Sequence, residues 1–141
     1  MSNPERALLL DTHVWLWLMS REGSIKPSVI RAVEEAAHYG LVRVSAISVW
    51  EVAMLEARGR IRFSKDCLSW VNEALRAPGL GLIPLTPEIA VESSRLPGAF
   101  HGDPADRILV ATARRQGATF LTRDEKILVY GKAKHLSVMA V

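Results

Sequence analysis

The chain has 141 residues, of which 49% are hydrophobic and 23% charged, as expected for one folded domain over residues 1–141. Its single cysteine, Cys67, excludes an internal disulfide framework, and no apolar run has the length of a membrane span or the form of a secretory signal. We therefore expect a cytoplasmic protein with no membrane partner. Its net charge of +3 permits binding to a polyanion but does not require it.

Short apolar runs alternate with helical patterns along the whole chain. The predicted strands are residues 7–11, 41–45, 82–85, 118–121 and 136–141. The predicted helices are residues 12–19, 27–39, 46–57, 66–77, 87–95, 104–116 and 125–130. Strands separated by helices imply a mostly parallel sheet with right-handed crossovers and helices on both faces, so the expected fold class is α/β.

Polar side chains that cap helices set several of these boundaries. Ser45 is expected to cap the helix that follows it. Asp103 precedes Pro104, which is the N-cap and first-position arrangement of a helix start. Thr122 is expected to cap the last short helix. We therefore interpret Asp103 mainly as a capping residue.

Four acidic residues occupy positions where an α/β chain places ligand-binding groups. Asp11 ends the first strand and Asp124 follows the fourth, and ligands of such sheets gather beyond the carboxyl ends of the strands. Glu51 and Asp106 each fall on the apolar stripe of a predicted helix. The stripe of Glu51 contains Ile47, Met54 and Leu55, and that of Asp106 contains Leu109, Val110 and Ala113.

Each acid also has an ordinary structural interpretation. Asp11 and Asp124 can cap or support the helix that follows, and Asp106 lies in a first turn, where an acid favours the helix N-terminus. For Glu51 taken alone, a salt bridge is the favoured interpretation. The functional interpretation depends on several acids that face one region, because a divalent cation would satisfy them together. Mg²⁺ and Mn²⁺ prefer such oxygen ligands.

A cation held in this way would suit the hydrolysis of a phosphodiester. It would offset phosphate charge, lower the pKa of a bound water and stabilise the departing oxygen. The chain has no Gly-x-Ser-x-Gly motif, no P-loop and no Cys/His cluster of the zinc type. The pattern of residues therefore favours a metal-dependent nuclease over an enzyme with a serine or cysteine nucleophile.

Four segments resemble the PIN-domain family, specifically the VapC-type toxins of bacterial type II toxin–antitoxin systems. The matching segments are Leu8–Trp15, Ser45–Val52, His101–Arg107 and Leu121–Asp124. Their order and spacing fit, and the resemblance covers essentially the whole chain. It implies a three-layer α/β/α PIN-like fold and an Mg²⁺- or Mn²⁺-dependent endoribonuclease that forms a homodimer and is inhibited by a cognate antitoxin.

The resemblance also assigns roles to individual residues. The catalytic and metal-binding positions of the family match Asp11, Glu51, Asp106 and Asp124. Thr122 matches a polar position that assists the site. Asp103 is the neighbouring acid of the family's Asp-Pro-x-Asp-Arg segment, and its contact with the metal is left open.

Basic residues near these segments are candidates for contacts with the RNA backbone. These candidates are Arg58, Arg60, Arg62, Arg107 and Arg123. A solvated loop explains the first three equally well. Arg114 and Arg115 are expected on a solvated helix face. The four tryptophans are expected to pack in the core, and a groove for an antitoxin helix is the alternative.

Other classes of function fit parts of the same pattern. A receiver-type phosphoacceptor module shares the doubly wound sheet and the Asp/Mg²⁺ pocket. That module needs an early acidic pair and a mid-chain Asp at a strand end, and neither is present. A non-catalytic metal-binding module fits the acids as well. A DNA-cutting relative also fits, because four carboxylates do not distinguish the 2′-hydroxyl of RNA.

Overall fold

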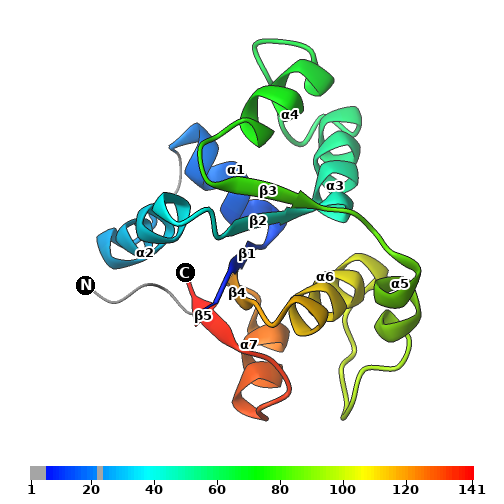
Figure 1. The fold of residues 1–141 in the computed structure, drawn as a ribbon. Coiled ribbons are helices and arrows are strands. Elements are labelled where there is room, and N and C mark those ends of the chain that lie inside the picture. The colour runs from blue at the N-terminus through cyan, green and yellow to red at the C-terminus, as the bar shows by residue number, and fades with distance from the viewer. Residues whose placement is uncertain (1–5, 22–23) are drawn as a thin grey trace.

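The computed structural model describes residues 6–21 and 24–141. Its five strands are β1 (Leu8–Leu10), β2 (Val42–Ser45), β3 (Leu80–Ile83), β4 (Thr119–Thr122) and β5 (Val138–Ala140). They form one sheet in the order β3-β2-β1-β4-β5, and every neighbouring pair is parallel (Figure 1). The predicted α/β class is confirmed, and its sheet is wholly parallel.

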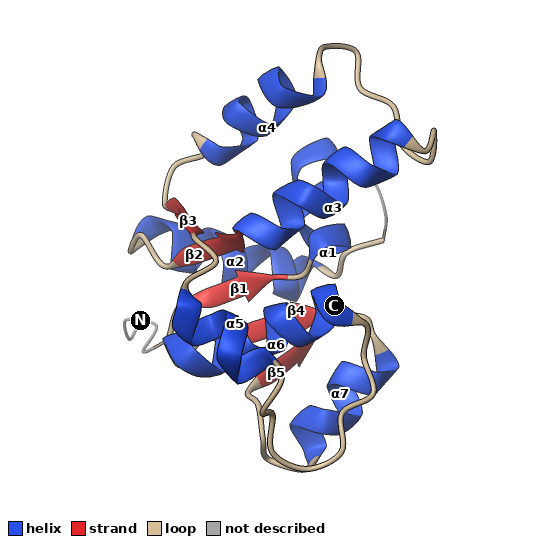
Figure 2. Cartoon of the chain, turned by 90° about the vertical axis from the view of Figure 1, so that its right-hand side faces the viewer, coloured by secondary structure: helices blue, strands red, loops and turns tan. Residues whose placement is uncertain are grey.

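Helices cover both faces of this sheet. They are α1 (Thr12–Ser20), α2 (Pro27–His38), α3 (Ala46–Ala57), α4 (Cys67–Leu75), α5 (Pro87–Ser93), α6 (Pro104–Gln116) and α7 (Glu125–Lys132). Helices α1 to α4 lie on one side of the strands and α5 to α7 on the other, which is the expected three-layer arrangement (Figure 2). Within the described residues, no helix is long and apolar enough to cross a membrane.

Successive residues of the central strand pack into opposite layers. Leu8 and Leu10 join a core cluster with Trp15 of α1. Leu9 joins a second cluster with Leu109 of α6. This alternation follows from the two-residue period of a strand. Because both faces of β1 are buried, the strand is apolar at every position, as its sequence predicted.

Strand β3 begins two residues earlier than predicted, at Leu80 instead of residue 82. It pairs with β2 over four residues, and its last residue, Ile83, is opposite Ser45. Pro84 follows directly, and proline has no N–H with which to continue the ladder. The prediction placed Pro84 inside the strand, and it also missed Leu80 and Gly81 at the start.

Capping side chains begin the helices on either side of the sheet. Ser45 accepts a backbone N–H of α3 at 3.1 Å, and Asp103 accepts the N–H of Asp106 at 2.8 Å. Both capping predictions are confirmed. The prediction for α7 is wrong, because Asp124 caps this helix. Thr122 is the last residue of β4, and its hydroxyl makes different contacts, described below.

The strand order places a depression at one end of the sheet. The chain adds β2 and β3 on one side of β1 and then returns to add β4 and β5 on the other. The helices after β1 and β4 therefore leave toward opposite faces, and a crevice opens beyond the carboxyl ends of these two strands. Asp11 follows β1, and Asp124 lies shortly after β4. Two acids far apart in the sequence thus become neighbours.

Gly79, between α4 and β3, is a position where the fold requires glycine. Its φ is +80°, and a Cβ atom there would lie 2.0 Å from the carbonyl oxygen of Ala37 in α2. Gly79→Ala therefore strains the backbone and displaces α2. We expect the free energy of unfolding, measured in urea, to fall by about 2–4 kcal/mol.

Gly59→Ala is the matched control for this substitution. Gly59 has a φ of +70°, but no heavy atom lies within 4 Å of the added Cβ. Only the backbone strain remains, and it costs about 1 kcal/mol. Equal losses in the two variants would show that the close approach of Gly79 to α2 is unimportant.

Candidate active site

Five carboxylates and one guanidinium line a pocket of about 380 Å³ beyond the carboxyl ends of β1 and β4. The acidic residues are Asp11, Glu51, Asp103, Asp106 and Asp124, and the basic residue is Arg123. They come from the two strand ends, from α3 and from the start of α6. The structure thus brings together the four acids proposed as catalytic, and it places Asp103 with them. We call this the acidic pocket.

Asp11 is held through both of its carboxylate oxygens. Oδ1 accepts the N–H of Thr12 at 2.8 Å, and Oδ2 accepts the hydroxyl of Thr122 at 2.6 Å. Thr122 is fully buried, and its hydroxyl also accepts the N–H of Asp124 at 3.0 Å. Burial raises the pKa of Asp11, and the negative charge of Asp124 raises it further. The hydrogen bonds that Asp11 accepts from Thr122 and Thr12 lower this pKa. Thr122 therefore links the acids that follow adjacent strands.

Glu51 depends on two buried hydroxyls that the sequence did not single out. Thr12 donates to Oε1 of Glu51 at 2.6 Å, and its oxygen lies 2.8 Å from that of Ser48. Because the Thr12 proton is used on Glu51, Ser48 is the donor to Thr12. Both hydroxyl residues are buried. Burial raises the pKa of Glu51, and the hydrogen bond from Thr12 lowers it.

Asp106 is the least satisfied acid of the pocket. Its backbone N–H donates to Asp103, but no described residue donates a hydrogen bond to its carboxylate. Burial raises its pKa to about 7, helped by the negative charges of Asp103, Asp11, Asp124 and Glu51. Near neutral pH, burial and these charges thus favour the protonated form of this carboxyl far more than in an ordinary aspartate. It needs a positive partner more than any of its neighbours.

The capping interpretation of Asp103 and Asp124 is correct, and it leaves room for a second role. Oδ1 of Asp124 accepts the N–H groups of Lys126 and Ile127 at 2.8 and 3.1 Å. Oδ1 of Asp103 accepts the N–H of Asp106. In each carboxylate the second oxygen makes no hydrogen bond within the described residues. One oxygen holds a helix end, and the other stays available to a cation.

Arg123 is fixed at the rim of the acidic pocket. Its guanidinium carbon lies 4.4 Å from the centroid of the Trp17 ring, a cation–π contact. Its nitrogens donate to the backbone oxygens of Val141 at 2.8 Å and Ser24 at 2.5 Å. The predicted location beside the acids is therefore correct. Its contact with RNA stays a prediction.

The donor atoms of the pocket fit a hard divalent cation. Apart from the exposed imidazole of His13, they are carboxylate and hydroxyl oxygens, the ligands that Mg²⁺ and Mn²⁺ prefer. In residues 6–21 and 24–141, no three Asp, Glu, His or Cys side chains are arranged to hold a metal ion by themselves. Mg²⁺ suits this open arrangement, since it keeps several waters and binds through one or two carboxylates. The raised pKa of Asp106 marks the negative charge that such an ion would offset.

Several predicted RNA contacts lie away from the acids. Arg107 donates to the carbonyl oxygens of Ser93 at 2.8 Å and Phe100 at 2.6 Å, so it fixes the segment between α5 and α6 and does not line the pocket. The structure therefore gives no support to Arg107 as a phosphate ligand. The remaining predicted contacts are exposed just beyond α3 and outside the acidic pocket: Arg58, Arg60 and Arg62. Contact of these three residues with RNA stays a prediction.

The inward face of α3 is rotated from the predicted stripe. Its buried residues are Ser48 and Val52, whereas Ile47 is only partly buried. Glu51 therefore lies at the edge of the core and not within an apolar stripe. The stripe predicted on α6 is correct, because its apolar members beyond Asp106 are fully buried. The difference arises because α3 packs against α1 through small hydroxyl side chains, which hydropathy does not reveal.

Trp50 is not a core residue, contrary to the prediction for the tryptophans. It is 52% exposed, whereas Trp15 is fully buried. Trp50 lines an apolar groove of about 360 Å³ between α3 and α6, and this groove shares Glu51 and Asp103 with the acidic pocket. An exposed aromatic side chain therefore borders the acids.

Removal of the Thr12 hydroxyl tests the support of Glu51. Thr12→Val conserves shape but leaves a half-buried carboxylate without its donor. We expect the free energy of unfolding to fall by about 1–3 kcal/mol and the pKa of Glu51, followed by ¹³C NMR, to rise. Thr112→Val is the control, because the Thr112 hydroxyl donates only to the carbonyl of Ile108 within α6. We expect this control to change stability by less than about 0.5 kcal/mol, and a similar loss in both variants would contradict the role of Thr12.

Comparisons with known proteins agree with this architecture. The PIN domain model matches residues 8–133. Ribonuclease VapC22 of Mycobacterium tuberculosis is 33% identical over 120 residues, which are 85% of this chain and 88% of the relative. A chain of DNA-bound VapBC from Salmonella typhimurium superposes with a TM-score of 0.70 at 11% identity, covering 96% of this chain and 98% of that one. VapBC2 from Rickettsia felis, bound to a DNA fragment from its promoter, gives 0.69 at 15% identity, with 95% and 98% covered. At such identities these two structures support the fold alone, whereas the extent of the domain match and the 33% identical relative establish that the chain belongs to the PIN domain family.

Proposed function

We propose that this protein is a metal-dependent endoribonuclease and the toxin of a type II toxin–antitoxin pair. The observation that carries the proposal is the group of five acids in one pocket, among which the pKa of Asp106 is raised to about 7 by burial and by the negative charges of its neighbours. The relative with 33% identity is named a ribonuclease, which supports RNA as the substrate. In this proposal the unit that acts is the single domain over residues 1–141.

The residues proposed to hold the cation are Asp11, Glu51, Asp106 and Asp124. When bound, Mg²⁺ or Mn²⁺ would neutralise phosphate charge and activate water for hydrolysis of the phosphodiester. The chain itself orients the acids: Thr122 holds Asp11, and Thr12 holds Glu51. The N-termini of α6 and α7 lie beside the pocket and favour the approach of a phosphate. Arg123, fixed at the rim, is proposed to contact the RNA backbone.

An antitoxin and a second copy of the chain are the proposed protein partners. The neighbouring solved structures are described as VapBC complexes, which supports an antitoxin. We propose that the antitoxin docks on an apolar groove of about 530 Å³ between α1 and α2. For the homodimer, the exposed Trp50 on its apolar groove is the supporting feature, since aromatic residues are enriched in interface centres. Sedimentation velocity of the wild type and Trp50→Ala tests the dimer.

Cleavage of a defined RNA tests the proposed function. We expect cutting by the wild type with Mg²⁺ or Mn²⁺ and none with EDTA, and strongly reduced cutting by Asp11→Asn. A DNA strand of the same sequence serves as the second substrate. Preferential cutting of this strand would identify the protein as a deoxyribonuclease. Metal binding in the pocket without cleavage of either strand would favour a non-catalytic module. Equal cutting by the wild type and the variant would refute the proposed site.

A further inference from the structure

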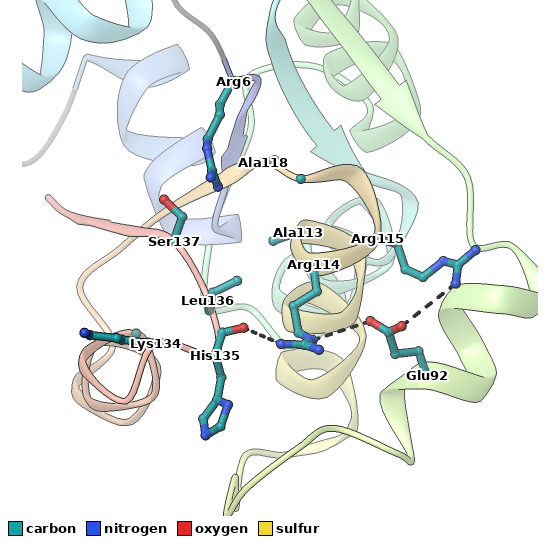
Figure 3. A pocket seen from close by; sticks show the side chains of 12 residues that line it. Arg6, Glu92, Ala113, Arg114, Arg115, Ala118, Lys134, His135, Leu136 and Ser137 are labelled. Atoms are coloured by element: carbon teal, nitrogen blue, oxygen red, sulfur yellow. Dashed lines mark hydrogen bonds and ion pairs between the residues drawn. The ribbon is translucent and has the colours of Figure 1, made fainter.

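A second, basic pocket lies at the opposite end of the sheet from the acids. Its volume is about 660 Å³, compared with about 380 Å³ for the acidic pocket. Arg6, Ala118 and Ser137 line it just before the starts of β1, β4 and β5, and the C-terminal turns of α6 and α7 close its sides. In Figure 3 the basic side chains stand around the small apolar residues of the centre. This basic pocket has no part in the proposed hydrolysis.

Positive charge dominates the lining of this pocket. The cations are Arg6, Arg114, Arg115 and Lys134, and the carboxylate is Glu92. Oε2 of Glu92 lies 3.6 Å from Nε of Arg114, and its other oxygen lies 4.0 Å from a nitrogen of Arg115. Arg114 also donates to the carbonyl oxygen of His135 (Figure 3). Arg114 is thus a fixed structural cation and not the solvated residue that the sequence suggested.

The helix dipole explains the position of only some of these cations. Arg114 and Arg115 lie in the last turn of α6, where cations offset roughly half a negative charge at the helix end. Arg6 belongs to no helix, and neither it nor Lys134 makes an ion pair or side-chain hydrogen bond with residues 6–21 and 24–141. Lys134 has a φ of +66°, where glycine or asparagine is favoured. The pocket thus keeps two cations that form no ion pair with a described residue.

We propose that the basic pocket binds a ligand that carries a phosphate group, either a free nucleotide or a segment of an RNA strand. Guanidinium groups bind phosphate through paired N–H donors, and an ammonium adds a point charge. The hydroxyls of Ser137, which lines the pocket, and Thr119 lie 2.9 Å apart, so one donates to the other and one proton stays free at the strand starts. Ala118 and Leu136 give the centre an apolar surface, and the volume lies in the usual range for small-molecule sites.

NMR titration of the full ¹⁵N-labelled chain tests this proposal without any need for activity. The probes are inorganic phosphate, uridine 5′-monophosphate and a ten-nucleotide oligouridylate, in EDTA at low ionic strength. We expect the amides of Gly117, Gly131 and Ser137, which line the pocket, to shift with saturation. The amide of Asn72, an exposed residue of α4 outside both pockets, is expected to stay in place. The oligonucleotide and the mononucleotide separate the two sources of phosphate, because tighter binding of the strand assigns the pocket to RNA.

The double variant Arg6→Gln, Lys134→Gln removes the two charges that form no ion pair with a described residue. Both side chains are exposed and without hydrogen bonds in the described structure, so we expect an unchanged fold and a dissociation constant for every probe raised on the order of tenfold. The control Arg31→Gln, Arg76→Gln changes net charge equally at exposed positions outside the pocket and is expected to bind like the wild type. Shifts absent from the pocket amides, or equal weakening in both double variants, would overturn the proposal. Neither result would affect the proposed ribonuclease, which depends on the acidic pocket.

Discussion

Asp106→Asn is expected to lower kcat/KM for RNA cleavage by at least about a thousandfold, which corresponds to roughly 4 kcal/mol of lost transition-state stabilisation. The side chain keeps its shape but loses its charge. Its carboxylate has no hydrogen-bond donor among the described residues and is surrounded by four other acids. The substitution therefore removes a metal ligand without breaking a contact of the fold. Initial rates on a labelled RNA at saturating Mg²⁺ measure the effect.

Asp66→Asn provides the matched control. Asp66 is exposed and caps α4, outside the acidic pocket, and asparagine caps helices as well as aspartate does. We expect this variant to cleave RNA at the rate of the wild type. If Asp106→Asn retained more than about a tenth of wild-type kcat/KM, the loss would be too small for a ligand of the catalytic ion.

The stability of the metal-free protein is expected to fall as the pH rises from about 4 to about 7. The pKa of Asp106 is about 7 in the folded state, against 3.8 for an ordinary aspartate. Between these values the folded state binds more protons than the unfolded state, so deprotonation favours unfolding. The pKa values of Asp11 and Glu51 are also raised and act in the same direction. After a discount for the partial exposure of Asp106, its contribution is about 1–2 kcal/mol.

Mg²⁺ is expected to reverse this loss. At a concentration of about one hundred times its Kd, a ligand that binds only the folded state stabilises it by about 2.7 kcal/mol. In EDTA, Asp106→Asn is expected to be more stable than the wild type at pH 7, because it removes a partly buried charge that the neighbouring acids also repel. Urea denaturation at pH 4 and 7, with Mg²⁺ or with EDTA, gives all of these free energies. A metal-free wild type that lost no stability relative to Asp106→Asn between pH 4 and 7 would contradict the raised pKa of Asp106.

The fold followed from local features of the sequence to a large extent. The apolar run before Asp11 is a strand buried on both faces, and the caps Ser45 and Asp103 begin helices at the predicted residues. Each of these features depends on only a few neighbouring residues, so it can be recognised in the sequence. The order of the strands does not follow from local features, because it depends on pairings such as Leu10 with Leu121. The error at β3 was local, because Pro84 is a direct signal for the end of a strand.

The four acids were identified from the sequence, but their supports were not. Asp11 and Asp124 follow strands that prove to be adjacent, so their position predicted their meeting. Thr12 and Ser48 were missed because the hydrogen bond from Thr12 to Glu51 crosses 39 residues and the one between Thr12 and Ser48 crosses 36. Arg107 shows the opposite error, since its place beside Asp106 in the sequence suggested a site residue, whereas its side chain binds backbone carbonyls away from the pocket.

Binding of Mn²⁺ followed by ¹⁵N NMR tests the central claim, that the acidic pocket holds a divalent cation. Mn²⁺ broadens the resonances of nearby amides, so its position can be located without cleavage of any substrate. We predict that small amounts of Mn²⁺ broaden the amides of Thr12, Asp106 and Asp124 and leave that of Gly59 sharp. We also predict that Asp106→Asn loses this broadening at the same Mn²⁺ concentration and that Asp66→Asn retains it. Broadening centred elsewhere in the molecule, or equally strong in Asp106→Asn, would contradict the claim.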